Sequence, residues 1–465
     1  MQIKKIRIEH ISIFHQLFRW SIIVTPVSIV IGSIVAFFLW ILNLSIHYRF
    51  GHPYLLYLLP VAGLGIHFLY QSVGKSSEKG NNLIMDEIHK PGGGVPKRMA
   101  PIVLFATVIT HLFGGSAGRE GTAVQIGGSI AQMFGKWFGL NQRDTGIVLT
   151  AGIAAGFGAV FGTPLTGAIF ALEVLAIGKI KYDALLPCLI AGTVGDLTVS
   201  AWKVQHTHYH IDFVQKLHSD YWLSEYISVD ILLILKIIVA SIAFGLASFL
   251  FAETAHRIKN VMLKLFSKKW LIPIIGGIVI ILLTFINGKP DYLSLGVDAE
   301  YPNAVTIQSA FHSGGADVWS WLWKTVYTTI TLGTGFKGGE VTPLFYIGAT
   351  LGNTLSELMN APVSLFAALG FIAVFSGATN TPLACTIMGI ELFGGEFTLY
   401  YAIACFTAYF FSGHSGIYTA QRIEVPKISD DYFSMENSLS ESGKRREHFI
   451  RYHFKRYKTI LKKKK

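Results

Sequence analysis

Long apolar stretches recur along almost the whole chain, and this pattern limits the possible folds more than any other feature. A helix needs about 20 apolar residues to cross the hydrocarbon core of a bilayer, and the first apolar stretch, at 17–46, is longer than that. Of the 465 residues, 51% are hydrophobic and 14% are charged, whereas a soluble domain has about 25% charged residues. One soluble core could not bury this much apolar surface. The sequence therefore predicts an all-α polytopic membrane protein and argues against a soluble enzyme.

Several of the apolar windows are too short for a simple membrane span and end in glycine or proline. Short, interrupted segments of this kind indicate broken or re-entrant helices that are buried against other helices. The 47 glycines of the chain also fit close helix packing and exposed backbone amides at helix starts. The windows lie at 17–46, 54–70, 99–113, 146–177, 185–199, 231–251, 271–286, 318–332, 344–359, 363–375, 382–393 and 399–411.

Two short motifs occur twice, in the same order, in the two halves of the chain. Gly-x-Glu-x-Thr is found at 118–122 and again at 338–342, and each copy runs into a segment that contains Ile-Gly. The Thr-Pro-Leu runs at 163–165 and 381–383 also correspond to each other, because a glutamate follows the proline of each by nine positions, at Glu173 and Glu391. The two motifs are repeated at shifts of 220 and 218 residues. Two ordered matches at nearly one shift predict two related halves, as in many transporters, but spacing alone does not tell whether the halves are inverted.

The repeat and the distribution of charge divide the chain into four segments. We expect a first transmembrane half at 15–215 and a second at 216–425, between an N-terminal segment at 1–14 and a basic tail at 426–465. The net charge is +11, and basic residues crowd both ends. The positive-inside rule then predicts a multi-pass protein of the cell (plasma) membrane with both termini in the cytoplasm. We expect no cleaved signal peptide, because the first apolar stretch is long, and no nucleic-acid partner for the tail.

The first Gly-x-Glu-x-Thr copy places Glu120 directly after a glycine-rich turn at 114–118. An ionisable group at membrane depth is costly and usually functional. Bare N–H groups at a helix start, together with the helix dipole, attract anions. The carboxylate of Glu120 could fill such an anion site and leave it once protonated, which would make this residue both a gate and a proton carrier. A glutamate that only caps a helix is the alternative.

Three further residues are candidates for the same site. Glu340 belongs to the second copy of the motif, whose backbone amides would face the first copy across the middle of the protein. Its alternative is a buried carboxylate that backbone donors satisfy. Asn81 follows Gly80 at the start of another apolar stretch, and its side chain could donate an N–H to an anion or could be an ordinary N-cap. Tyr418 could point its hydroxyl into a pathway or lie in an interfacial aromatic belt.

One pattern in the sequence suggests an enzyme. The Gly-x-Ser-x-Gly pattern at 114–118 is also that of a nucleophile elbow, but such an elbow needs a strand before it, and here an apolar run of helical type precedes it. An intramembrane serine protease that uses Ser116 and His111 is the alternative from the enzyme class. It leaves the duplicated glutamate motif unexplained.

We expect neither a metal nor a cofactor. His206, His208 and His210 alternate along the chain and could face one way to bind a metal, but we expect a solvated loop between spans. The three cysteines, Cys188, Cys385 and Cys405, lie in apolar segments without metal-ligand spacing and are interpreted as small buried side chains.

Taken together, these motifs resemble those of the CLC chloride channels and transporters. The run Gly118-Arg119-Glu120-Gly121 is similar to the gating-glutamate motif of that family, and the segment at 338–343, Tyr418 and the duplicated organisation also fit. The resemblance covers about residues 15–425. It implies an inverted-repeat fold of many tilted and broken helices, a homodimer in which each subunit has its own pathway, and anion binding where helix N-termini meet near the midplane.

The departures from the usual CLC pattern resemble the fluoride-exporting subgroup, CLC-F. Asn81 stands where the family usually has serine, and Thr122 where a proline typically follows the gating motif. Val174 replaces the internal proton-transfer glutamate of the chloride–proton exchangers, and Glu340 and Thr342 replace apolar residues. The resemblance implies a selectivity role for Asn81, gating for Glu120, and a central position for the other polar residues. The full candidate site is Asn81, Arg119, Glu120, Gly121, Glu340, Val341, Thr342 and Tyr418.

This resemblance implies a fluoride/proton antiporter that exports fluoride from the cytoplasm in exchange for protons. Fluoride is small and strongly hydrated, so its site must replace the hydration water with close, strong donors, which amides and hydroxyls such as those of Asn81, Thr342 and Tyr418 provide. A chloride/proton exchanger and a passive anion channel are the alternative transport functions. The expected partners are fluoride, protons, the lipid bilayer and a second copy of the chain, with chloride as a second candidate ion.

Overall fold

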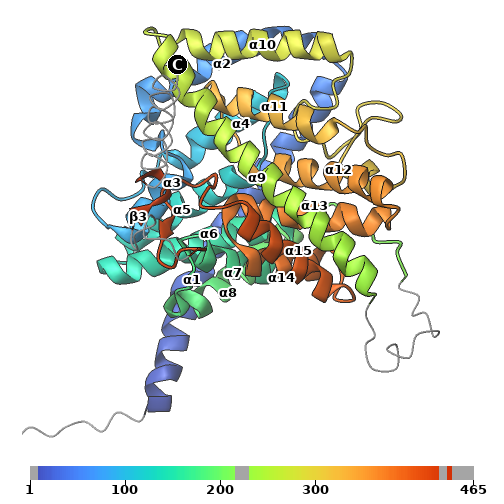
Figure 1. Ribbon diagram of the computed structural model, residues 1–465. Coiled ribbons are helices and arrows are strands. Elements are labelled where there is room, and N and C mark those ends of the chain that lie inside the picture. The colour runs from blue at the N-terminus through green and yellow to red at the C-terminus, as the bar shows by residue number, and fades with distance from the viewer. Residues whose placement is uncertain (1–8, 215–229, 429–436, 442–465) are drawn as a thin grey trace, which may run out of the picture.

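The computed structural model describes residues 9–214, 230–428 and 437–441. Most of the basic end segments expected at 1–14 and 426–465 lies outside these ranges. Most of the described chain is helical and its strands are very short (Figure 1), which confirms the all-α prediction. The first-half helices are α1 (Glu9–Phe50), α2 (Leu59–Leu69), α3 (Asn81–His89), α4 (Met99–Leu112), α5 (Glu120–Trp137), α6 (Gln142–Phe161), α7 (Pro164–Glu173) and α8 (Leu185–Ala201). The second-half helices are α9 (Ile231–Leu265), α10 (Leu271–Asn287), α11 (Ser320–Gly333), α12 (Val341–Met359), α13 (Val363–Thr379), α14 (Pro382–Phe393) and α15 (Thr398–Phe411).

Three two-residue strands form the sheet of the described chain. β1 (Ala176–Ile177) pairs in parallel with β2 (Arg422–Ile423), and β2 pairs in antiparallel fashion with β3 (Asn437–Ser438). The sheet joins the segment after α7 to the segment after α15. It therefore ties the last described residues to the helical body.

Five helical stretches of the described chain are long and apolar enough to cross a membrane. The first, in α1, extends beyond the helical body at its N-terminal end, and the longest helix of the second half, α9, runs obliquely across one face in front of α13 (Figure 1). The other apolar helices have 10–17 residues, as expected for broken helices packed inside a membrane protein. The five stretches are Ile13–Phe50, Pro53–His89, Gln142–Phe161, Tyr182–Ala201 and Ile231–Leu265.

Two of the expected windows are wrong in extent. The single window at 146–177 is two helices, α6 and α7, because Gly162 takes a left-handed conformation with φ of 71° and Pro164 starts the next helix. The window at 231–251 continues as α9 to Leu265. In addition, none of the apolar windows expected from the sequence covers α5. Its 18 residues contain four glycines and two glutamines, so its hydropathy is low although nearly all of it is buried.

The helices that carry the repeated motifs pack backbone against backbone at equivalent places. A β-carbon placed on Gly127 of α5 would lie 2.0 Å from the carbonyl oxygen of Gly152 in α6. A β-carbon on Gly348 of α12 would lie 2.0 Å from the carbonyl oxygen of Gly370 in α13. The Ile-Gly pair after each Gly-x-Glu-x-Thr motif is thus a helix-crossing point, where only a hydrogen fits between the two backbones.

The second repeated motif holds the two halves together through exchanged carboxylates. The Glu173 side chain, at the end of α7, accepts two backbone N–H bonds of 3.1 and 2.7 Å from the first turn of α14. The Glu391 side chain, near the end of α14, accepts two N–H bonds of 2.9 and 2.8 Å from the first turn of α7, and a 2.6 Å bond from the Thr166 hydroxyl. Each glutamate satisfies the free donors of the other half's helix, which explains the nine-residue spacing.

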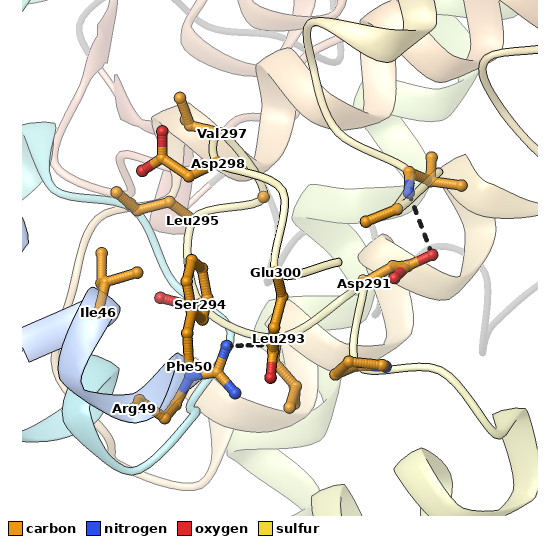
Figure 2. Close-up of a pocket in the computed structure, with 14 residues that line it drawn as sticks. Ile46, Arg49, Phe50, Asp291, Leu293, Ser294, Leu295, Val297, Asp298 and Glu300 are labelled. Carbon is orange, nitrogen blue, oxygen red and sulfur yellow. Dashed lines mark hydrogen bonds and ion pairs between the residues drawn. The ribbon is translucent and has the colours of Figure 1, made fainter. Parts of the chain in front are cut away.

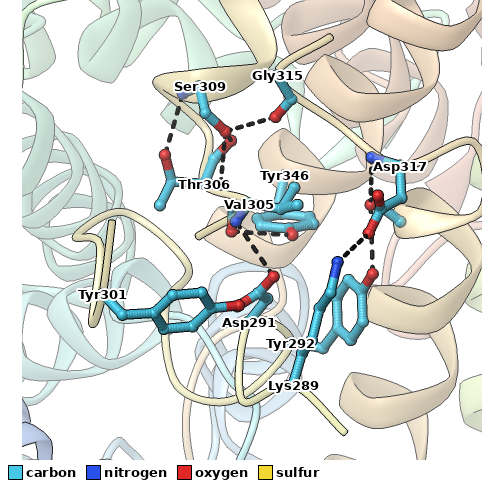
Figure 3. Close-up of polar contacts among 11 residues, drawn as sticks. Lys289, Asp291, Tyr292, Tyr301, Val305, Thr306, Ser309, Gly315, Asp317 and Tyr346 are labelled. Carbon is cyan, nitrogen blue, oxygen red and sulfur yellow. Dashed lines mark hydrogen bonds and ion pairs between the residues drawn. The ribbon is translucent and has the colours of Figure 1, made fainter. Parts of the chain in front are cut away.

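A long irregular segment between α10 and α11 covers the end of α1. The guanidinium of Arg49, in the last turn of α1, donates to Glu300 at 2.7 Å (Figure 2). Asp291 accepts a 2.5 Å bond from the Tyr301 hydroxyl and a 3.2 Å bond from the Val305 N–H (Figure 3). The Arg49–Glu300 pair fixes the segment to α1, and the Asp291 bonds hold parts of the segment to each other. Val297 of this segment lines a cavity together with Glu120.

Candidate ion-transport site

The two Gly-x-Glu-x-Thr motifs meet face to face. The Gly118 N–H donates to the Gly339 carbonyl at 2.6 Å, and the Gly339 N–H donates to the Gly118 carbonyl at 2.7 Å, which makes an isolated antiparallel bridge. A β-carbon on Gly118 would lie 3.0 Å from the Gly339 oxygen, so glycine lets the two backbones approach. The bridge places the first residues of α5 and α12 side by side with opposite chain directions.

The carboxylate of Glu120 lies where these two helices begin. Thr342 donates to it twice, through its backbone N–H at 3.1 Å and through its hydroxyl at 2.5 Å. The Arg119 N–H donates at 3.1 Å, and the Arg119 Nε lies 3.6 Å from the carboxylate. The Glu120 side chain is 1% exposed. A negative group at the start of two helices is favoured by both helix dipoles, and all of its donors are groups that would equally bind a small anion.

Removing the Thr342 hydroxyl should weaken this position for any negative group. We expect Thr342→Val to slow ion transport about tenfold, because a hydrogen bond to a charged group contributes roughly 1.5–3 kcal/mol. Thr342→Ser keeps the hydroxyl and should transport at close to the wild-type rate. Initial rates of anion efflux from proteoliposomes would measure the difference. Equal rates for the valine and serine variants would show that the hydroxyl has no part in the site.

Asn81 and Glu340 lie together beside Gly121. A β-carbon on Gly121 would lie 3.1 Å from the Asn81 Nδ2 and 3.7 Å from a Glu340 carboxylate oxygen. Asn81 is the first residue of α3, after Gly80 with its φ of 57°. Its Oδ1 is buried without a hydrogen-bond partner. Three helix starts, those of α3, α5 and α12, therefore converge on one small region. The sequence predicted this meeting for the two copies of Gly-x-Glu-x-Thr, which begin α5 and α12.

Tyr418 is buried, at 5% exposure, so the structure excludes a place in an exposed aromatic belt. Its segment is fixed to α3, because the Ala420 N–H donates to the Asn82 Oδ1 at 2.9 Å. The tyrosine is near enough to Glu340 and Glu120 for their charges to act on its hydroxyl. Val341 contributes a buried side chain as the first residue of α12, so only its backbone is suited to contact an ion.

The sequence did not single out two lysines near this site. Lys337 and Lys259 are close enough to Glu340 for their charges to act on it, and the Lys337 ammonium lies 4.2 Å from the centre of the Tyr70 ring. Lys337 lies directly before the second Gly-x-Glu-x-Thr copy, so its place in the sequence could have predicted that it lies near the site. Lys259 lies in α9, far away in the chain, and no local pattern pointed to it.

The structure argues against the serine protease alternative. The Ser116 hydroxyl pairs with Thr328 at 2.9 Å, whereas His111 pairs through Nδ1 with Ser294 at 2.9 Å. The two residues thus have separate partners, as structural polar groups do. Among the described residues there is also no group of three metal-binding side chains, and the three cysteines are buried and free.

One expectation about the histidines is wrong. His206 does not lie in a solvated loop: its side chain is 17% exposed, and it lines a cavity together with Arg119 and Glu120. His208 and His210 are exposed, as expected. The loop folds inward at His206 because Gly162, which ends α6, leaves room for the imidazole ring.

Comparison with known proteins agrees with this architecture. The family model described as "Voltage gated chloride channel" matches residues 62–413, and the chain therefore belongs to this family, the CLC channels and transporters. A "Chloride/fluoride channel protein" of Pseudomonas syringae pv. tomato (strain ATCC BAA-871 / DC3000) is 45% identical over 419 residues, which are 90% of this chain and 89% of that protein. The family is one of membrane transport proteins, in line with the prediction that the chain is not an enzyme.

Solved structures show the same fold. The crystal structure of a CLC-type fluoride/proton antiporter matches with a TM-score of 0.80 and 34% identity, over 88% of this chain and 98% of the other. A slow cyanobacterial Cl⁻/H⁺ antiporter matches with a TM-score of 0.70 and 20% identity, over 86% of this chain and 96% of the other. At that lower identity the second match supports the fold alone.

Proposed function

We propose that this protein is a fluoride/proton antiporter that moves fluoride out of the cytoplasm while protons move in. The observation that carries the proposal is the place of the Glu120 carboxylate, which accepts two bonds from Thr342 at the meeting point of α5 and α12. The likeness to a 34% identical CLC-type fluoride/proton antiporter and to a 45% identical chloride/fluoride channel protein supports the choice of ion.

Competition between fluoride and Glu120 for one set of donors would couple the two ions. A fluoride ion needs the donors that now bind the carboxylate. A proton bound to Glu120 removes its negative charge, so the side chain loses its attraction to the helix starts and leaves the place free. Asn81, Glu340 and Tyr418 would receive fluoride on the inner side, where their amide, carboxyl and hydroxyl groups replace its hydration water. An inward proton gradient would then drive fluoride outward.

Two transport alternatives remain within the same family. A chloride/proton exchanger would be expected to keep the internal glutamate, but Val174 occupies that position. A passive anion channel would not need Glu340, a second carboxylate beside the first. For both alternatives we expect fluoride, chloride and proton fluxes that differ from those of a fluoride/proton antiporter.

A paired efflux assay separates these functions. Proteoliposomes loaded with fluoride or with chloride would be followed by ion electrodes, with and without a pH gradient. The antiporter should release fluoride faster than chloride, should take up protons as it does so, and should accumulate fluoride against its gradient when a pH gradient is imposed. Fluoride release without proton movement would instead identify a channel, and faster chloride exchange would identify a chloride transporter.

Replacing Asn81 by serine, the usual family residue, should reduce the preference for fluoride. The Asn81 amide lies next to Gly121, close to Glu340. A hydroxyl is shorter and offers one donor where an amide offers two, so we expect the fluoride-to-chloride rate ratio to fall about tenfold, the equivalent of one lost hydrogen bond of about 1.4 kcal/mol. Efflux of both ions from the same proteoliposome preparation measures the ratio. An unchanged ratio would remove Asn81 from the selectivity position.

We further propose that the protein works as a homodimer in the cell membrane, with both termini in the cytoplasm. The family resemblance and the charge distribution support this arrangement. The helices α7 and α14, which exchange their carboxylates, also leave Leu165 and Leu383 exposed, at 51% and 37%. Such a pair of apolar side chains on adjacent helices fits a helix–helix contact in the membrane. Cross-linking in native membranes would test the dimer.

A further inference from the structure

Two cavities share a common wall, and the smaller of them reaches Glu120. The larger, of about 670 Å³, is lined by the C-terminal half of α1 and by the loop after α8, residues 202–207. The smaller, of about 20 Å³, lies against Glu120 and Thr342. The residues that line both cavities are Arg119, His206, Thr207 and Val297. The direct path from the large cavity into the small one therefore runs past these four residues.

His206 contributes a titratable imidazole to this wall, and one of its two ring nitrogens has no hydrogen-bond partner. The Nε2 atom is buried and makes no hydrogen bond. It lies 3.9 Å from a carboxylate oxygen of Asp196 in α8, beyond hydrogen-bond distance. A β-carbon on Gly162 would lie 2.6 Å from the His206 Cδ2, so the ring packs closely against the end of α6. A buried polar atom without a partner is rare and indicates a functional role or a bound water.

The small cavity is large enough for one water molecule, which needs about 10–15 Å³. Its polar lining consists of Arg119, Glu120, His206, Thr207, Tyr209 and Thr342. A single water in this space would share the cavity with both the imidazole of His206 and the Glu120 carboxylate, because both side chains line it. Proton transfer over one intervening water is within the reach of general acid–base groups.

The charges around His206 favour a neutral ring in this closed state. His206 belongs to the loop between α8 and α9 and not to a membrane-spanning helix. Burial first, and then the charges of Arg119 and His208, lower the pKa of His206 to about 4, although a contact with the backbone of Val160 acts in the opposite direction. The remaining charged groups around it are Glu120 of α5 and Asp196 of α8, and Lys203 and Asp298 line the large cavity. A group with a low pKa next to an acid can take up a proton briefly and pass it on, but does not hold it.

We propose that His206 is a proton-transfer residue that delivers protons from the large cavity to Glu120. The proposal rests on the proposed antiport and on its topology, in which the large cavity faces outward. A hydronium ion that enters the shared wall from the large cavity gives its proton to the Nε2 lone pair, and Asp196 stabilises the imidazolium. The imidazolium then gives a proton through the water of the small cavity to a Glu120 carboxylate oxygen. His206 is neutral again, and one proton has moved without any change in covalent heavy-atom bonds.

The test compares two variants that differ only in whether they can titrate. His206→Gln cannot carry a proton, whereas His206→Glu has a nearly identical shape and can. Fluoride efflux would be followed from whole cells without other fluoride exporters, because all copies of the protein then face one way. The outer pH is varied between about 5 and 7, so that the supply of protons to the large cavity changes while the low pKa keeps His206 mostly neutral.

Wild-type efflux should rise as the outer pH falls. His206→Gln should lose most of this rise and be about tenfold slower at the acidic end, less than the about hundredfold typical of a positioned acid–base group, because water in the large cavity partly replaces it. His206→Glu should recover several-fold of that loss. The exposed His208, two residues further along the same loop, supplies the matched control, and His208→Gln should follow the wild-type profile.

Three outcomes would overturn the proposal. Equal profiles for the glutamine and glutamate variants would mean that the ring only fills space against Gly162. A wild-type profile for His206→Gln would mean that protons reach Glu120 by another route. If wild-type efflux itself shows neither proton uptake nor dependence on outer pH, the proposed antiport fails first, and the role of His206 fails with it. The wild-type measurement thus separates failure of the function from failure of the residue assignment.

Discussion

Glu120→Gln should abolish the coupling of proton movement to anion movement. The amide keeps the size of the side chain but cannot exchange a proton at the meeting point of α5 and α12, so we expect proton uptake during fluoride efflux to fall about a hundredfold or more, the size of effect that a positioned proton-transfer group supplies. A pH electrode and a fluoride electrode in the same proteoliposome suspension would measure both fluxes.

The matched control is the exposed Glu396. Glu396→Gln removes the same charge at a place outside the site and should leave both fluxes at wild-type values. Full coupling in the Glu120→Gln variant would contradict the assignment of Glu120 as gate and proton carrier. Loss of coupling in both variants would indicate a general effect of charge and would contradict it as well.

The second large effect concerns folding. Gly348→Ala should prevent the chain from reaching its native state, because the added β-carbon would lie 2.0 Å from the Gly370 carbonyl oxygen. The two helices α12 and α13 would have to separate, and overpacking of this kind costs about 3 kcal/mol or more, a large part of the roughly 5–15 kcal/mol that stabilises a typical protein. The yield of monodisperse protein in size-exclusion chromatography, together with its Tm, would report the loss.

Gly65 in α2 provides the control for this change. It is also a helical glycine, but a β-carbon there would meet nothing within 4 Å, so Gly65→Ala should express and elute like the wild type. A Gly348→Ala protein with an unchanged Tm would show that the α12–α13 crossing relaxes easily. The same test applied to Gly127, at the equivalent crossing of α5 and α6, should give the same outcome as Gly348.

Much of the fold was predictable because lipid leaves few solutions for so apolar a chain. The helical class, most helix positions and the motif that begins α5 all followed from hydropathy and repetition. The position of α5 itself was missed because glycine and glutamine lower its hydropathy, although its burial is nearly complete. The break between α6 and α7 was present in the sequence as Gly162 and Pro164, but the continuous apolar window at 146–177 hid it.

The residues at the centre of the candidate site could be predicted from the sequence, whereas the residues around them could not. Glu120, Thr342 and Glu340 stood in the repeated motif, and chain symmetry brought them together. His206 could not be found in this way, because the depth of a loop depends on the space that a distant residue, Gly162, leaves open. Arg49 and Glu300 likewise pair at 2.7 Å across 251 residues, and no local pattern connects them.

The exchanged carboxylates of Glu173 and Glu391 have a consequence for how such a chain arose. Each half supplies the acid that completes the other half's helix start, so a single half on its own would leave donors at that start open and one acid without its counterpart. Two identical copies of an ancestral half, however, could have completed each other reciprocally before gene fusion joined them. Separate polypeptides for the two halves should therefore reassemble when made together, and neither should accumulate when made alone.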